Sequence, residues 1–455
     1  MAATDSHSSE PMPSLDGKAE DSVARSRATH RTIETVFRME RARILAALAR
    51  FTRSVDLAEE FAQDALIAAL RNWPEAGIPD KPGAWLIASA KRRAIDHFRR
   101  AKMAEGKLAL LGIDSEAEVT VEPLEIDDNL GDELLALMFV SCHPVLSTEA
   151  RVALTLRLVG GLSTEEIARA YLVSETAMAQ RIVRAKRTLS DAGVPFEMPG
   201  YPDRGERLGS VLEVLYLVFN EGYSATKGDD WMRPQLCQEA MRLGRMLAGL
   251  APDEPEVHGL IALMEIQASR LPARSDAEGR PILLLDQNRA RWDHLLINRG
   301  LAALARAQAL PRHGPYTLQA AIAACHARAH TAEETDWPRI AALYAALAEL
   351  APSPVIELNR AMALSMAFGP AAGLELADQL VHEPALRNYH LLPSVRADLL
   401  MKLGRFREAL GEFERAAALT QNERERTMLM ERAHSCRDEL ARKDGKGRGS
   451  AVQRS

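Results

Sequence analysis

Charged side chains gather at two places in the C-terminal half of the sequence, in spacings that suit acid–base chemistry. Glu213 and Glu221 lie two helical turns apart in one apolar stretch. Residues 286–293 hold four more charges: Asp286, Arg289, Arg291 and Asp293. General acid–base catalysis needs carboxylates whose pKa values are pushed apart in a pocket, and a sequence does not show this. An internal ion-pair network at a domain junction explains the same residues, and we favour that interpretation.

The cysteines are not spaced as metal ligands or disulfide partners. They lie far apart, at Cys142, Cys237, Cys325 and Cys436. His143 is next to Cys142, and we interpret this pair as a buried thiol beside an ordinary imidazole. The sequence also lacks a phosphate-binding glycine loop and a nucleophile elbow. We therefore expect no enzymatic activity, no cofactor and no metal.

A clearer chemical signal comes from polar and basic residues in the segment GGLSTEEIARAYLVSETAMAQRIVRAKRTL, residues 160–189. Ser163 and Glu166 form a capping box, so a helix is expected to begin near Thr164. Its buried face is expected to hold Ile167, Ala168, Tyr171 and Leu172. Ser174 can cap a second helix, and the apolar residues of that helix recur at steps of three and four: Met178, Ile182, Ala185 and Leu189.

The other positions of this second helix form an outer face that suits the major groove of DNA. The face combines base-edge readers with phosphate partners. Its residues are Glu175, Thr176, Gln180, Arg181, Arg184 and Arg187. The pattern is typical of a helix-turn-helix, and the alternative is a helical hairpin with a solvated basic face.

A second basic segment follows two amphipathic helices near the N-terminus. The second of these helices is expected over residues 56–72, with Asp56 as its cap. A loop at residues 74–84 then precedes a helix that begins with Trp85 and ends in the run KRRAIDHFRR. A loop and an aromatic ring beside a cationic helix can hold unstacked bases. Trp85 and Phe98 are equally well explained as core residues.

Composition and charge set limits on the whole chain. With 455 residues, 47% hydrophobic and 5% aromatic, the sequence suits several alanine- and leucine-rich helical domains. The net charge of −6 is concentrated in residues 114–133, which hold acids and no base. This segment is expected to be a flexible linker, either a plain spacer or a nucleic-acid mimic. Without a membrane-length apolar run or a secretory signal, the protein is expected in the cytoplasm.

Residues 31–192 resemble the two conserved regions of extracytoplasmic-function sigma factors of RNA polymerase. The motifs that carry the resemblance are DLAEEFAQDALIAALRNW, PGAWLIASAKRRAIDHFRR and the helix-turn-helix segment, in that order. The resemblance implies a subunit that binds core RNA polymerase and promoter DNA. It needs no active site of its own, because the core polymerase does the chemistry.

The resemblance also implies roles for individual residues. Five residues of the 56–72 helix would bind core polymerase: Asp56, Glu59, Glu60, Gln63 and Asp64. We expect Glu59 and Asp64 to be exposed. Residues 74–100 would hold the promoter element at −10 through Trp85, Lys91, Arg92, Arg93, Arg99 and Arg100. The outer face of the 174–189 helix would read the element at −35.

The rest of the chain resembles the long extension of one sigma subgroup. Beyond Asp336, helices are expected near Trp337, Pro354, Ala371, Tyr389, Phe406 and Asn422. Their interval of about 17 residues is half the tetratricopeptide period. Stacked helix pairs of this kind offer a concave surface for a protein or peptide ligand. The segment 371–383 fits the repeat poorly.

The predicted fold is all-α, with two small sigma-type domains before a large helical, tetratricopeptide-like solenoid. The predicted divisions are 1–28 (disordered), 29–104 (sigma region 2), 105–132 (linker), 133–192 (sigma region 4), 193–330 (helical extension), 331–440 (repeats) and 441–455 (disordered tail). The predicted function is promoter-specific transcription initiation, with the extension regulating or enabling activity. The alternatives are a helix-turn-helix regulator with a helical sensor domain, and a repeat-built scaffold.

Overall fold

The computed structural model describes residues 15–109, 130–171, 173–224, 232–277, 279–420 and 422–452. Within these ranges the regular structure consists of α-helices and short 3-10 helices, with one isolated β-bridge between Ser275 and Pro281. The predicted all-α fold is confirmed. Contacts divide the chain into two compact units. The first unit is Met1–Thr164 with Ala179–Arg207, and the second is Glu165–Met178 with Leu208–Ser455.

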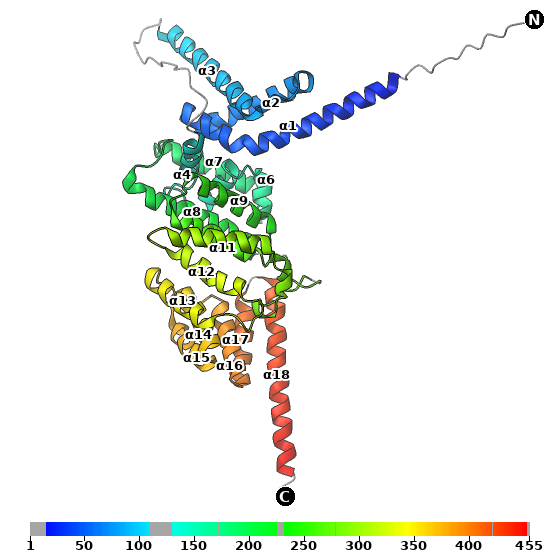
Figure 1. Cartoon of the computed structure of the whole chain (residues 1–455), viewed down its shortest axis with the longest axis vertical. Helices are drawn as coiled ribbons and strands as arrows, with labels where there is room; N and C mark the ends of the chain where they lie inside the picture. Colours follow the sequence, from blue (N-terminus) through cyan, green and yellow to red (C-terminus); the bar gives the residue numbers. More distant parts are fainter. Residues whose placement is uncertain are drawn as a thin grey trace, which may run out of the picture. The chain divides into compact units, whose positions relative to one another are not determined.

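The first unit is built on three long helices that pack against one another (Figure 1). These are α1 (Leu15–Thr52), α2 (Val55–Ala76) and α3 (Pro82–Ala109), and α4 (Leu130–Ser141) packs on both α1 and α5 (Thr148–Leu158). Small residues on the buried face of α2, including Ala58, Ala62 and Ala65, let its neighbours approach closely. Trp73 fills the end of this core with only 2% of its surface exposed.

The sequence predicts disordered residues at both ends of the chain and a flexible acidic linker between the two sigma-type domains. Helix α1 begins at Leu15, inside the segment predicted to be disordered, and α18 (Glu423–Val452) runs into the predicted tail. Most of the predicted acidic linker, residues 110–129, lies outside the described residues. The predicted domain boundaries remain predictions.

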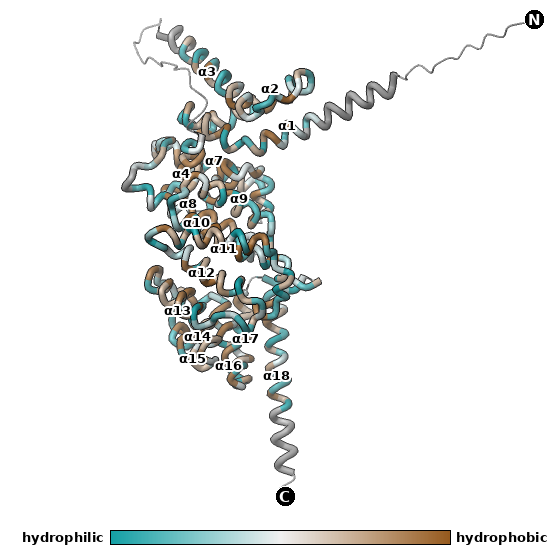
Figure 2. Tube along the Cα trace, in the orientation of Figure 1, coloured by the Kyte–Doolittle hydropathy of each residue, from teal (hydrophilic) through white to brown (hydrophobic). Residues whose placement is uncertain are grey.

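In the second unit, α10 (Pro255–Ala268) is the most buried helix. It packs on α9 (Pro234–Leu250), α11 (His294–Ala309) and α12 (Pro315–Arg328), and residues of α8 (Tyr201–Tyr223) complete this core. Brown, hydrophobic stretches alternate with hydrophilic ones along α10 and α11 in Figure 2. Glu256 of α10 accepts hydrogen bonds from the backbone N–H groups of Gly314, Tyr316 and Thr317, and so caps α12. Between α10 and α11 lie η1 (Leu271–Ala273), η2 (Leu284–Asp286) and η3 (Arg289–Arg291).

Toward the C-terminus, each successive helix packs on the next. The helices are α13 (Trp337–Leu350), α14 (Pro354–Phe368), α15 (Pro370–Gln379), α16 (Leu391–Lys402), α17 (Phe406–Leu419) and α18. All six begin within two residues of the predicted positions. The poor fit of segment 371–383 to the repeat has a structural counterpart, because α15 is short and two 3-10 turns follow it, η4 (Leu380–His382) and η5 (Pro384–Leu386). The tetratricopeptide type itself remains a prediction.

Across the described ranges, none of the helices combines the length and the apolar character needed to cross a membrane.

Candidate nucleic-acid and protein interfaces

Helix α2 presents acidic residues on the side opposite its buried face. The helix starts at Val55, and its cap is Ser54, whose hydroxyl accepts a hydrogen bond from the backbone N–H of Leu57 at 3.3 Å. The prediction that Asp56 caps this helix is therefore wrong. A capping residue keeps an extended backbone, which Ser54 has, whereas Asp56 already lies in the first helical turn. There the positive end of the helix dipole stabilises its carboxylate.

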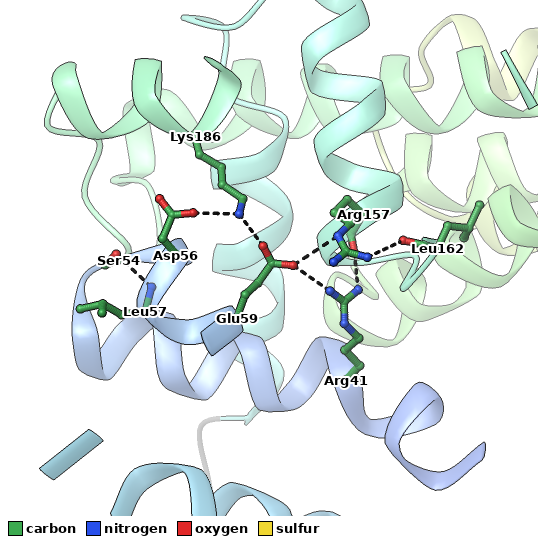
Figure 3. Close-up of polar contacts among 8 residues, drawn as sticks. All are labelled: Arg41, Ser54, Asp56, Leu57, Glu59, Arg157, Leu162 and Lys186. Atoms are coloured by element: carbon green, nitrogen blue, oxygen red, sulfur yellow. Dashed lines mark hydrogen bonds and ion pairs between the residues drawn. The ribbon is translucent and has the colours of Figure 1, made fainter. Parts of the chain in front are cut away.

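Glu59 lies at the centre of an ion-pair cluster that joins four helices of the first unit (Figure 3). One carboxylate oxygen accepts from Arg41 of α1 at 2.7 Å and faces Arg157 of α5 at 3.3 Å. The other oxygen accepts from Lys186 of α7 (Glu175–Asp191), which also contacts Asp56 at 2.8 Å. The side chain of Glu59 is 16% exposed. The expectation that Glu59 is exposed is wrong, because three cations surround it.

Backbone carbonyls complete the geometry of this cluster. Arg41 also donates to the carbonyl oxygen of Arg157 at 2.6 Å, and Arg157 donates to that of Leu162 at 3.2 Å. Burial, followed by the neighbouring charge of Arg157, lowers the pKa of Arg41 to about 10 against the opposing effect of Glu59. Burial alone would lower the pKa of Lys186 too, but Glu59 and Asp56 outweigh it and raise that pKa above its ordinary value. Arg41 and Lys186 therefore remain charged at neutral pH.

The other predicted residues of α2 lie outside the Glu59 cluster. Glu60 and Gln63 are exposed. Asp64 is partly exposed and pairs with Arg93 of α3 at 3.2 Å. Of the five residues predicted to bind core polymerase, two thus belong to the Glu59 cluster, one pairs with α3, and two face solvent.

The connection between α2 and α3 is shorter than predicted. Helix α2 continues through Pro74 to Ala76, and α3 begins at Pro82, so the loop is 77–81 rather than 74–84. Pro74 is tolerated near the end of the helix, and Pro82 occupies a first turn, where a missing N–H costs nothing. Gly77 ends α2 with a φ of 84°, which favours glycine.

The aromatic side chains of Trp85 and Phe98 on α3 are each partly buried. Trp85 is half-buried and packs edge to face on Trp73, with ring centroids 5.2 Å apart. Phe98 is also half-buried, 6.2 Å from the Phe51 ring. Along α3, Lys91 and Arg93 are half-buried, whereas the other three basic residues are exposed: Arg92, Arg99 and Arg100. The surface of α3 thus combines a half-buried indole ring with exposed cations.

The predicted helix-turn-helix pattern matches the observed helices. Helix α6 (Thr164–Ala170) begins where the capping box predicts, and Ser174 caps α7 by accepting from the N–H of Ala177 at 3.2 Å. The predicted inward residues of α7 are all buried: Met178, Ile182, Ala185 and Leu189. Of the first helix, Ile167 and Ala168 are buried and Tyr171 is half-buried, while Leu172 lies outside the described residues.

The outer face of α7 is open to solvent. Arg181 is half-buried, and the other predicted readers are exposed: Glu175, Thr176, Gln180, Arg184 and Arg187. Arg184 donates to Gln180 at 3.2 Å, and Arg187 pairs with Asp191 at 3.4 Å. Both contacts are exposed and lie within one helix, so they are weak and do not prevent binding to another molecule.

The families that match the chain agree with this geometry. The family "Sigma-70 region 2" matches residues 36–103, and "Sigma-70, region 4" matches residues 136–189. The chain belongs to the sigma-70 family. It is a sigma factor of the extracytoplasmic-function type with a long C-terminal extension, and it serves promoter-specific transcription. Core RNA polymerase and promoter DNA are the partners that these regions imply, and sigma factors are not enzymes.

The extension has relatives as well. A family of unknown function (DUF6596) matches residues 207–308 of the sigma factor. An uncharacterized protein of Rhizobium meliloti (strain 1021) is 46% identical over 387 residues, which cover 84% of this chain and 90% of that protein. The similarity therefore extends well beyond the two sigma regions.

In the second unit, the extension of the sigma factor holds the turn of the helix-turn-helix. Arg233 donates to the carbonyl oxygen of Ala170, the last residue of α6, at 2.6 Å. The same guanidinium pairs with Glu221 of α8, and the two side chains are 14% and 12% exposed. Burial, then the nearby Glu221 charge, raises the pKa of Tyr171. The predicted internal ion pair is thus present at Glu221.

The second group of charges, residues 286–293, has a different role from the one predicted. Asp293 caps α11, and Arg289 donates to the carbonyl oxygens of His326 and Ala329 at 2.7 and 2.8 Å. Asp286 and Arg291 are exposed, and among the described residues no ion pair joins any two of the four. The expected ion-pair network is wrong here, because backbone acceptors and a helix end satisfy the charges instead.

The cysteines of the sigma factor are buried thiols, as predicted for Cys142. Burial raises the pKa of Cys142 to about 11, and its sulfur lies 3.1 Å from the hydroxyl of Thr155. Within the described ranges, no three potential metal ligands gather at one place.

Two residues of the Glu59 cluster, Arg157 and Lys186, were not among the predicted site residues. Lys186 lies one turn after the buried Ile182, at the edge of the apolar face. This position at the edge of the apolar face is the feature of the sequence that distinguishes Lys186 from the exposed residues of the outer face. Arg157 gives no comparable signal, because its partners come from α1 and α2, far away in the sequence.

Proposed function

We propose that this sigma factor engages its two partners through three separate surfaces. The acidic side of α2, including Asp56, Glu60 and Gln63, binds core polymerase. Trp85 and the basic residues of α3 hold the −10 element, and the outer face of α7 reads the −35 element. The exposure of Glu60, Gln63 and the α7 readers supports this assignment. Trp85 has the half-buried position of a ring fixed on one side and accessible on the other.

We further propose that the extension enables initiation by supporting the helix-turn-helix. The observation that carries this proposal is the contact of Arg233 with the Ala170 carbonyl. That carbonyl belongs to the last turn of α6, where no intrahelical donor is available. Arg233, a half-buried arginine held by Glu221, satisfies this carbonyl. Without the extension, the C-terminal end of α6 loses this donor. Tyr171 also loses its charged neighbours Glu221 and Arg233.

Run-off transcription with purified core polymerase tests the role of the extension. Arg233→Ala is expected to lower promoter-dependent transcript by about 10-fold, equivalent to about 1.4 kcal/mol. Arg242→Ala on α9 is the control, because the ion pair with Glu239 that it removes lies within α9. Equal transcription from the Arg233 and Arg242 variants, with both proteins folded, would refute the supporting role.

Truncation after Val194 provides a coarser test of the same proposal. It removes Glu221 and Arg233 while leaving both sigma regions, and we expect loss of run-off transcript. A cooperative melt of the truncated protein must be shown first, because removal of α8 to α18 exposes apolar surface. A protein or peptide ligand of helices α13 to α18 remains a prediction that binding experiments with the full chain have to address.

A further inference from the structure

Three arginines of the second unit lie between the end of α8 and the end of α12. The guanidinium carbon of Arg274 is 3.6 Å from the centroid of the Tyr223 ring, and that of Arg270 is 5.6 Å from the same centroid. Arg270 also donates to the Tyr223 hydroxyl, and Arg274 donates to the Tyr223 carbonyl oxygen. Arg289 donates to the carbonyl oxygen of His326 in α12 at 2.7 Å. These three arginines form the arginine cluster.

The charges of the arginine cluster act on one another and on a neighbouring imidazole. Burial lowers the pKa of Arg274, and the charge of Arg270 adds to this effect. Burial lowers the pKa of Arg289 as well, where Arg270 adds to the effect and Glu333 opposes it. The low pKa of His326 follows from burial and then from the charges of Arg270 and Arg289. The positive charge of Arg270 therefore acts on three neighbouring groups.

The positive charge of this cluster is only partly balanced. In the described part of the chain, the hydrogen-bond acceptors of Arg270 and Arg289 are uncharged. They are a tyrosine hydroxyl for Arg270, and two carbonyl oxygens with the Thr335 hydroxyl for Arg289. Glu333 and Glu334 act on Arg289 from exposed positions, where water and salt screen their charge. Half-buried cations of this kind favour an anionic partner.

Three buried nitrogen atoms beside the arginine cluster have no hydrogen-bond partner among the described residues. They are Nε of Arg270, Nδ1 of His326 and Nε1 of Trp292, whose ring lies 5.0 Å from the Arg289 guanidinium. His326 and Trp292 are 8% and 4% exposed. Each of these nitrogens can carry a hydrogen and donate it, the imidazole in one of its neutral tautomers. Because buried donors are normally paired, they indicate a place where an oxygen acceptor is stabilised.

We propose that the arginine cluster binds a small molecule through an anionic oxygen group, either a carboxylate or a phosphate. A guanidinium presents parallel N–H donors that match both groups. Arg270 and Arg289 are half-buried, so a small solute contacts them from solvent, whereas the flat surface of a macromolecule does not reach the buried nitrogens. The site belongs to the extension, because its residues lie outside both segments matched as sigma regions.

Isothermal titration calorimetry of the full chain tests the site with two probes, inorganic phosphate and malonate, each at constant ionic strength. Saturable binding of at least one probe is expected. Tighter binding of phosphate assigns a phosphorylated ligand to the site, and tighter binding of malonate assigns a carboxylate ligand. Absence of saturable binding for both probes would overturn the proposal.

Variants of the full chain then locate the binding site. Arg270→Gln removes the central cation and is expected to weaken binding of the preferred probe by about 10-fold or more. Arg291→Gln is the matched control, because Arg291 is exposed and close to Arg289 in the sequence, and it should bind like the wild type. Equal binding by a folded Arg270→Gln variant and the wild type would overturn the proposal.

A second variant keeps the test decisive if Arg270→Gln does not fold cooperatively. His326→Phe preserves an aromatic ring against Trp337 and removes the unpartnered Nδ1. The proposal predicts weaker binding of the preferred probe by this variant. Unchanged binding by His326→Phe, together with loss of folding in Arg270→Gln, would mean that the arginines are structural and that the probe binds elsewhere.

Discussion

Region 4 is fixed at two places by carboxylate–cation contacts that differ in what supports them. In the first unit, Glu59 receives three cations, and long side chains make the connection to α7. In the second unit, Arg233 receives one carboxylate and holds a backbone carbonyl, with α8 and α9 closely packed behind it. Exposure of the two pairs is similar, so burial does not distinguish them. Backbone acceptors take part in both contacts, because Arg41 donates to the Arg157 carbonyl oxygen just as Arg233 donates to that of Ala170. The difference is that three cations share the carboxylate of Glu59, whereas one arginine makes the second contact.

The comparison teaches that similar ion pairs can serve different purposes. In the Glu59 cluster the loss of one cation leaves two others beside the carboxylate. A pair that holds a helix terminus against tightly packed backbone cannot be exchanged without disturbing the core. The first contact accordingly tolerates the loss of a single cation, whereas the second depends on one arginine.

The largest expected effect comes from breaking the packed contact at Gly222. A Cβ atom there would lie 2.6 Å from the backbone nitrogen of Cys237 and 2.9 Å from the Arg233 carbonyl oxygen. Gly222→Ala therefore forces α8 and α9 apart and should lower the free energy of unfolding by about 3 kcal/mol. Urea unfolding measures this loss. Gly209→Ala on the same helix has nothing within 4 Å and should be neutral or slightly stabilising. Equal stabilities of the two variants would contradict the tight packing.

The free energy of unfolding measured at several pH values tests whether His326 is shielded from water in the second unit. Burial, reinforced by Arg270 and Arg289, lowers the pKa of His326 from 6.5 to about 3. Above pH 6.5 both folded and unfolded chains hold a neutral imidazole, so stability is unaffected. Below pH 6.5 only the unfolded chain takes up the proton, which costs the fold about 1.4 kcal/mol per pH unit and about 2 kcal/mol at pH 5.

The variant His326→Phe isolates this effect from the titration of other groups. It keeps an aromatic ring against Trp337, where the present rings pack edge to face. Unfolding free energies measured at pH 7, 6 and 5 should fall more steeply for the wild type than for the variant. Parallel pH profiles would show that the imidazole is protonated in the fold.

A smaller effect is expected from the Glu59 cluster, because three cations share one acceptor. Glu59→Gln removes the common partner and should cost about 1.5 kcal/mol of unfolding free energy, reduced from the buried limit by partial exposure. Lys186→Met removes one cation of three and should cost about 0.5 kcal/mol. Denaturant unfolding at low and high salt distinguishes the two variants, since salt should reduce the difference between their free energies of unfolding. A larger loss for Lys186→Met would mean that the cations do not act redundantly.

The smallest effects are expected on the exposed face of α7. Gln180→Ala and Arg184→Ala should each change preference at one base pair of the −35 element by about 1 kcal/mol. Arg187→Ala should weaken all promoters alike and lower the salt dependence by about one phosphate contact. Binding of polymerase holoenzyme to a promoter library measures both. Identical sequence profiles for the three variants would exclude this face as the reader.

Local signals in the sequence predicted the helices well. The capping box at Ser163 and Glu166 gave the start of α6, and the positions of the six C-terminal helices followed from spacing alone. These signals succeed because caps and apolar periodicity act over a few residues. The cap of α2 was misplaced by two residues, since Ser54 and Asp56 are both good capping residues and only backbone geometry chooses between them.

The candidate sites were harder to predict because their contacts are distant in the sequence. Glu59 reads as an exposed acid on an amphipathic helix, and nothing near it in the sequence indicates Arg157 or Lys186 as partners. The predicted ion-pair network of residues 286–293 was wrong for the opposite reason. Their closeness in sequence suggested mutual pairing, but Arg289 reaches across to α12 and Asp293 turns to its own helix end.

Helix α7 has one further consequence, which is mechanical. Its first four residues, 175–178, are counted with the second compact unit, and residues 179–191 with the first. A helix of 17 residues is stiff, so a rotation imposed at one end is delivered at the other. Gln180 and Arg184 therefore keep a fixed spacing on α7, one helical turn apart. Two side chains held on one stiff helix move together, so a shift of α7 along a bound surface would change the contacts of both at once.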